Sequence, residues 1–165
     1  MEAMAAQSRH DREEAIAGAI YGTILTAATM SVVSDKRWDE PFLTSAQVLV
    51  TLVVFWMAHA FAHGVAVRVT EEEPHPREMA HDLRATWPMV AAAFPQLAPM
   101  VLVGLGVFTY DTGLWIAYAL AVAILASYGV VIARRRRLGK AGTVRLVFVM
   151  GILGLILITL KELIH

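Results

Sequence analysis

Long apolar stretches alternate with short polar ones along the whole chain. A transmembrane α-helix needs about 20 apolar residues to cross a hydrocarbon core of about 30 Å. Five stretches meet or approach this length, and they cover residues 15–34, 46–67, 85–109, 114–133 and 144–160. Nearly all charged residues lie outside them. The pattern predicts an all-α membrane protein, a bundle of about five transmembrane helices.

The polar segments that connect the predicted spans are short. They cover residues 35–41, 68–84, 110–113 and 134–140. None of them is long enough to form a second folded domain, so we expect a single helical domain over residues 1–165. The shortest segment, 110–113, is expected to be a bare turn between two spans.

The positions of lysine and arginine predict the orientation of the bundle. With the N-terminus in the cytoplasm, eleven of these residues lie on the inner side and three on the outer side. The run from Arg134 to Arg137 contributes most to the difference. Because cytoplasmic segments carry the excess of positive charge, we expect a cytoplasmic N-terminus. Eleven arginines against three lysines, with abundant Ala and Val, are typical of a GC-rich bacterium, which favours a bacterial inner membrane.

The composition excludes several functional classes. Hydrophobic residues make up 58% of the chain and charged residues 17%, against about 25% charged in soluble domains. The formal net charge is zero, so no nucleic-acid partner is expected. The chain has no cysteine, which excludes disulfides, thiolate metal ligands and cysteine nucleophiles. The expected environment is the lipid bilayer, with a homo-oligomer or another membrane protein as the candidate partner.

Four segments resemble a family of small bacterial integral membrane proteins to which no activity is assigned. The segments are Ala19–Ile24, Phe55–His63, Leu83–Pro88 and Leu160–His165. They are spread over four of the five predicted spans, so the resemblance concerns the whole fold. It implies a polytopic membrane protein, and it carries over no functional residue.

The second predicted span carries a series of residues at steps of three or four positions. They are Thr44, Gln47, Thr51, Phe55, His59 and His63. This spacing places them on one slowly drifting face of a helix. Ionisable residues within a span are costly and face the bundle interior or a water-filled cavity. His59 and His63 are therefore candidates for a proton relay or a divalent-metal site. The alternative is two neutral histidines that bond to neighbouring helices.

A metal site needs more ligands than these two histidines. The polar segment after the second span contains Glu78 and His81, and a Glu-x-x-His pair on a helix points both side chains at one ligand position. The pattern occurs once, whereas di-iron bundles use it twice. A solvated charged loop is the default interpretation. No cofactor is therefore predicted, and a divalent metal at His59, His63, Glu78 and His81 is the alternative.

The third predicted span contains prolines that predict a kink. Pro95 and Pro99 each remove a backbone hydrogen bond near the middle of the membrane, and Gln96 lies between them. A broken helix beside Gln96 is how transporters expose polar backbone to a substrate. The alternative is a static kink in which Gln96 bonds a freed carbonyl group.

Small residues predict where the first two spans pack. Gly18 and Gly22 form a GxxxG pattern, and Ala58 and Ala62 repeat the spacing on the second span. Small residues at this spacing let helix backbones approach closely. We therefore expect the first and second spans to touch. This contact would bring Glu14 towards His63 near the inner face.

These residues leave two classes of function open. The first is a small channel or transporter for protons or cations, which as a small bundle must form an oligomer. Its polar pathway consists of His59, His63, Gln47, Thr51, Gln96 and Glu14. The alternative is a non-catalytic scaffold or regulatory subunit of a membrane complex. No enzyme signature is found in the sequence, so no catalytic residue is assigned and enzymatic activity stays open.

Overall fold

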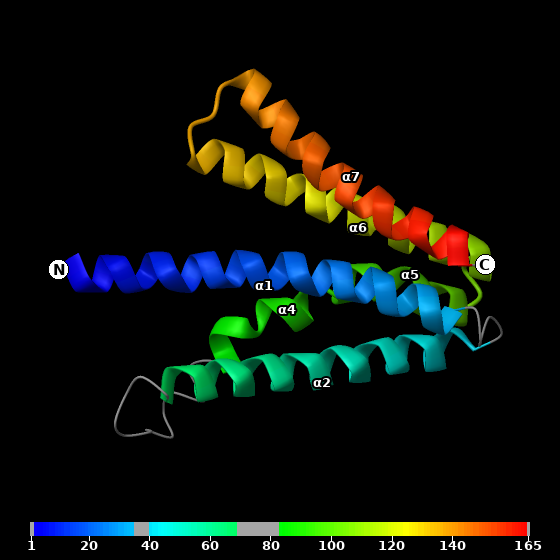
Figure 1. The fold of residues 1–165 in the computed structure, drawn as a ribbon. Coiled ribbons are helices and arrows are strands. Elements are labelled where there is room, and N and C mark those ends of the chain that lie inside the picture. Colours follow the sequence, from blue (N-terminus) through cyan, green and yellow to red (C-terminus); the bar gives the residue numbers. More distant parts are fainter. Residues whose placement is uncertain (1, 35–39, 69–82, 165) are drawn as a thin grey trace.

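The computed structural model describes residues 2–34, 40–68 and 83–164, and the regular structure of these residues is entirely helical (Figure 1). The helices are α1 (Glu2–Ser34), α2 (Pro41–Arg68), α4 (Pro88–Ala91), α5 (Phe94–Gly104), α6 (Tyr110–Arg135) and α7 (Lys140–Ile164). The predicted all-α class is confirmed.

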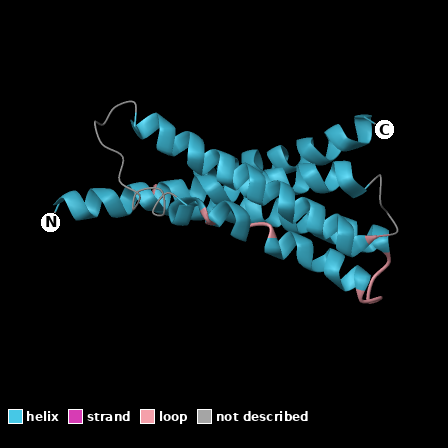
Figure 2. Cartoon of the chain, turned by 90° about the horizontal axis from the view of Figure 1, so that it is seen from below, coloured by secondary structure: helices cyan, strands magenta, loops and turns pink. Residues whose placement is uncertain are grey.

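Helix α1 lies at the centre of the bundle. It contacts α2, α4 and α5 on one side and α6 and α7 on the other (Figure 1). The N-terminus and the α6–α7 connection lie at one end, and the α5–α6 connection and the C-terminus lie at the other (Figure 1). Seen from below, the helices again run along one long axis (Figure 2).

Three helices contain segments that are long and apolar enough to cross a membrane. These segments are Arg12–Val33, Pro41–Ala62 and Tyr110–Arg135. The pair Leu83–Ala91 and Phe94–Gly104 becomes a fourth if it is counted as one broken span. The described part of the chain therefore has three to four helices that suit a membrane, where the sequence predicts about five.

The third predicted span is broken where α4 meets α5. The axis of Phe94–Gly104 is bent by 43° from that of Leu83–Ala91. Pro95 has no backbone N–H, so it cannot donate to the carbonyl oxygen of Ala91 four residues earlier. Pro99, by contrast, lies inside α5 without ending it. The break therefore coincides with the hydrogen bond that Pro95 removes.

Gln96 bonds the backbone at this break. Its side-chain Nε2 donates to the carbonyl oxygen of Ala92 at 3.2 Å, and its backbone N–H donates to Ala93 at 3.0 Å. The side chain is 1% exposed. A buried carbonyl at membrane depth needs a partner, and Gln96 supplies one from within the same turn.

The connection between α5 and α6 covers residues 105–109 and lies earlier in the chain than the sequence predicts. Gly106 has a φ of +75°, and Val107 N–H donates to the carbonyl oxygen of Leu102 at 2.9 Å. These features form a Schellman motif, which ends α5 at Gly104.

Helix α6 then begins at Tyr110, so the turn expected at 110–113 is wrong. Thr109 is the N-cap, and its Oγ1 accepts a hydrogen bond from the backbone N–H of Thr112 at 3.4 Å. Because this cap starts the helix, the four polar residues form the first turn of α6.

The core of the bundle lies between α1, α2, α5 and α6. It includes Met30, Leu52, Met100 and Tyr118. The Tyr118 hydroxyl hydrogen-bonds Ser31 of α1 at 2.8 Å, which links α1 to α6.

The hydroxyl groups of α1 bond their own helix. Thr23 Oγ1 donates to the carbonyl oxygen of Ala19, and Thr26 Oγ1 donates to that of Gly22. Both threonines are fully buried. Their polar atoms therefore need no partner from another helix.

Candidate functional site

A hollow of about 360 Å³ lies between α1, α2 and the segment that leads into α4. It is near the end of the bundle that holds the N-terminus. We call it the Glu14–His59 hollow, and it is lined by Glu14, Ala17, Gly18, Tyr21, His59, Thr86 and Met89. Two residues of the predicted polar pathway, Glu14 from α1 and His59 from α2, thus meet in one space.

The close approach of α1 and α4 forms the floor of this hollow. A Cβ atom added at Gly22 would overlap the backbone carbonyl of Met89. At Gly18 the added Cβ would lie 3.7 Å from the backbone nitrogen of Met89, an ordinary contact. The absence of a side chain at Gly22 therefore allows the close approach of α4, which carries Met89 of the hollow.

The partner of the two glycines differs from the expected one. Gly18 and Gly22 face Met89, whereas Ala58 and Ala62 of α2 are exposed. Helices α1 and α2 do contact each other, as expected. The proline-broken third segment places its short α4 against the glycine face of α1, so α2 contacts α1 along a different line.

A tryptophan of α2 hydrogen-bonds Thr86, one of the residues that line the hollow. Trp56 Nε1 donates to Thr86 Oγ1 at 3.0 Å, and the Trp56 and Trp87 rings meet edge to face at 5.5 Å. Neither Trp56 nor Thr86 was predicted as a site residue from the sequence. The available signal was the indole N–H of a tryptophan inside a predicted span, because such a group needs a hydrogen-bond acceptor.

Three side chains give the hollow its chemistry. Glu14 contributes a carboxyl group, His59 an imidazole and Tyr21 a phenol. The Tyr21 and His59 rings are nearly parallel, with centroids 6.4 Å apart and an interplanar angle of 26°. His59 is exposed, and Tyr21 is 45% exposed. These groups suit the binding of a proton or a cation.

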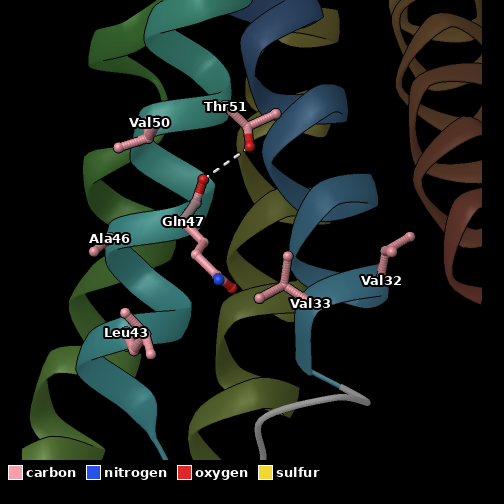
Figure 3. Close-up of a pocket in the computed structure, with 7 residues that line it drawn as sticks. All are labelled: Val32, Val33, Leu43, Ala46, Gln47, Val50 and Thr51. Carbon is pink, nitrogen blue, oxygen red and sulfur yellow. Dashed lines mark hydrogen bonds between the residues drawn. The ribbon is translucent and has the colours of Figure 1, made fainter.

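A second hollow of about 630 Å³ lies between α1 and α2, near the opposite end of both helices. Its lining residues are Val32, Val33, Leu43, Ala46, Gln47, Val50 and Thr51 (Figure 3). Thr51 Oγ1 donates to the backbone carbonyl of Gln47 at 2.8 Å. The Gln47 side chain extends towards Val33 of α1 (Figure 3). Gln47 and Thr51 thus share a hollow at the other end of the α1–α2 seam.

Gln96 is separate from both hollows. It is buried at the break before α5, where its amide bonds Ala92, and it lines neither space. This geometry matches the static-kink alternative rather than exposure of polar backbone to a substrate. The six residues of the predicted pathway are therefore not all brought together.

The remaining candidates lie outside what the structure describes. Glu78 and His81 fall in the range 69–82, and His63 belongs to α2 although its side chain is not among those described. Within the described residues, no group of three or more His, Asp or Glu side chains is placed to hold a metal ion.

Comparisons with known proteins returned no relative for this chain. No family model, no curated protein and no solved structure matches it. Its function is therefore argued from the fold and the site alone.

Proposed function

We propose that the protein is a small transporter or channel for protons or cations, with its path along the α1–α2 seam. The observation that supports this proposal is the shared space of Glu14 and His59 in one hollow. A carboxyl group and an imidazole from two different helices offer a site at which a proton or cation can bind. The Gln47–Thr51 hollow supplies polar groups near the other end of the same seam.

The cost of placing His59 in a span supports a functional role. His59 lies within the segment Pro41–Ala62, which is apolar enough to cross a membrane. Ionisable side chains in such segments are rare, and they mark ion pathways and proton relays. Histidine exchanges protons near neutral pH, so it suits a relay.

The proposed architecture has five spans. Helix α7 has 25 residues, about 38 Å at 1.5 Å per residue, which is enough to cross a bilayer. The segments Leu83–Ala91 and Phe94–Gly104 form one proline-kinked span. The Arg134–Arg137 run supports an N-terminus in the cytoplasm of a bacterial cell, with the bundle in its inner membrane.

The position of the seam requires an oligomer. His59 is exposed on the single chain, so an ion at this site is not enclosed by one bundle. A second copy facing the seam would cover it and exclude lipid. The exposed Ala58 and Ala62 lie on the same helix, and small residues allow another helix to approach.

Flux into proteoliposomes tests the proposal. Proton and cation uptake is measured for the wild-type protein and for the His59→Ala, His63→Ala and Glu14→Gln variants. We expect flux in the wild type and its loss in His59→Ala and Glu14→Gln. Glu13→Gln is the control, because Glu13 is the exposed neighbour of Glu14 and does not line the hollow.

The absence of flux in every protein, across a pH gradient and with common cations, would contradict the proposal. It would favour the scaffold alternative, in which α2 docks a partner through its exposed alanines.

A further inference from the structure

We infer that the Glu14–His59 hollow binds an organic ammonium cation. The inference names a substrate class for the proposed transporter and rests on that proposed function, although binding is measurable without transport. The ligand class is a primary or quaternary ammonium group on a short organic chain.

The charge of the hollow favours a monovalent cation. Among the lining residues that the structure describes, Glu14 is the only acidic one, and none is a lysine or an arginine. Much of the remaining wall is apolar, formed by Ala17, Gly18 and Met89. One carboxylate on an apolar wall matches one positive charge that carries alkyl groups.

The lining offers too few ligands for a bare metal ion. Calcium takes six to eight oxygen ligands, and zinc takes four ligands in a tetrahedron. The described lining residues offer one carboxyl group and one imidazole, which are side chains that bind zinc, together with the Tyr21 phenol and the Thr86 hydroxyl. That hydroxyl already accepts the Trp56 indole N–H. An ammonium group needs only a counter-charge and a surface to lie on.

The aromatic rings supply that surface. Cations lie over the face of a tyrosine ring within about 6 Å of its centroid, and quaternary ammonium ligands are recognised in this way. Tyr21 lines the hollow beside His59 and is 45% exposed, so its ring is accessible. Glu14 and Tyr21 are seven residues apart on α1, which places them on the same helix face.

The size of the hollow also suits an organic cation. Its volume of about 360 Å³ is at the lower end of the range for small-molecule sites, about 300–1,000 Å³. A water molecule occupies about 30 Å³ in the liquid, so a bare ion would leave most of the space filled with water. A short alkylammonium chain fills it with apolar groups against apolar walls.

Two sources can supply this chemistry. Glu14 lies close to the start of the apolar segment Arg12–Val33, which is the depth of lipid headgroups when that segment spans a membrane. The ammonium group therefore comes either from an ethanolamine headgroup or from a free molecule.

Equilibrium dialysis of choline against the full-length protein in a non-ionic detergent tests the inference. Choline is the charged probe, and 3,3-dimethylbutan-1-ol is its uncharged isostere. We expect saturable choline binding that the isostere does not displace. Glu14→Gln should weaken binding by at least about tenfold because the counter-charge is lost, while Glu13→Gln leaves binding unchanged.

A tyrosine pair tests the contribution of the ring. Tyr21→Leu should weaken choline binding by about threefold to fivefold, the range expected for a cation–π contact at a partly exposed site. Tyr128→Leu is the matched control, because Tyr128 is on α6 and does not line the hollow. Circular dichroism of each variant checks that the helices are intact.

Lipid nanodiscs distinguish the two sources. Choline binding is compared in phosphatidylglycerol alone and in phosphatidylglycerol mixed with phosphatidylethanolamine. Weaker choline binding in the mixture assigns the site to a headgroup, and equal binding assigns it to a free cation.

Three results would overturn the inference: no saturable choline binding, equal binding of choline and its isostere, or equal binding by Glu14→Gln and Glu13→Gln. The binding data also separate this inference from the proposed function. Choline binding without any flux would contradict the proposed transport function and support the ammonium site. Proton flux without choline binding would contradict the ammonium site and leave the transport function supported.

Discussion

At Gly22 the backbones of α1 and α4 are in direct contact. A methyl group there would overlap the carbonyl group of Met89, and no rotation of a side chain relieves an overlap with backbone. One turn earlier, at Gly18, the same methyl group would make an ordinary contact at 3.7 Å. Two glycines of one sequence pattern thus have different structural roles.

The two glycines predict opposite results for the same substitution. Gly22→Ala should destabilise the protein by about 1–3 kcal/mol, because α4 must move away from α1. Gly18→Ala should be close to neutral. Thermal unfolding in detergent, followed by circular dichroism, measures both. Equal stability of the two variants would contradict the close approach at Gly22.

A second prediction at this scale concerns Gln96. Gln96→Leu leaves the Ala92 carbonyl without its side-chain donor, so we expect a loss of about 1–3 kcal/mol in thermal unfolding. Gln47→Leu is the control, because the Gln47 side chain is only partly buried. An unchanged stability for Gln96→Leu would show that the bond to Ala92 contributes little.

Sequence and structure agree unevenly at the residue scale. The bond between Gln96 and a carbonyl near the prolines was one of two alternatives, because an amide beside a proline has few other partners at that depth. The contact of Gly22 with Met89 was not predicted. A small-residue pattern indicates that another helix packs closely against this one. Which helix that is depends on the path of the whole chain.

Among the elements, the pair α4 and α5 has the least regular geometry. Its 43° bend lies at residues 92–93, two to three residues before Pro95 and six to seven before Pro99. Only Pro95 coincides with an interruption of the helix. Substitutions at Pro95 and Pro99 can therefore be compared as test and control.

Pro95→Ala restores a donor for the Ala91 carbonyl and should straighten the pair. Spin labels on cysteines introduced at Arg84 and Leu105, both exposed, report the end-to-end distance by pulsed electron resonance. We expect an increase of about 2 Å from helix geometry. Pro99→Ala, the control, should leave the distance unchanged. The same distance in Pro95→Ala would mean that packing, rather than the missing N–H, holds the bend.

The start of α6 shows a limit of hydropathy at the element scale. Residues 110–113 are polar, so they were expected outside the span and were interpreted as a turn. Hydropathy reports where a chain can enter lipid, whereas the start of a helix depends on its cap. Thr109 provides that cap, and the helix therefore extends beyond its apolar part.

For the whole molecule, the apolar runs predicted the order of the helices, because each run must form a helix to satisfy its backbone in lipid. Their arrangement around α1 was not predictable, since nearly every face of such helices is apolar. The distribution of lysine and arginine predicts the orientation of the bundle in the membrane, and this orientation remains a prediction.

Single-cysteine labelling tests that orientation. The natural chain has no cysteine, so Gly139→Cys and Val107→Cys each carry one thiol. A Cβ at Gly139 meets no atom within 4 Å, and Val107 is exposed. In intact cells, a membrane-impermeant maleimide should label Val107→Cys and not Gly139→Cys. The reverse pattern would place the N-terminus outside.

The central place of α1 bears on how the protein is made. The ribosome produces this helix before the five helices that it contacts, so it can enter the bilayer ahead of them. Its buried hydroxyl groups do not have to wait for them, because Thr23 and Thr26 donate to carbonyl groups of α1 itself. These two hydroxyl groups are thus bonded within α1, and the helix offers each later helix a surface on which to pack.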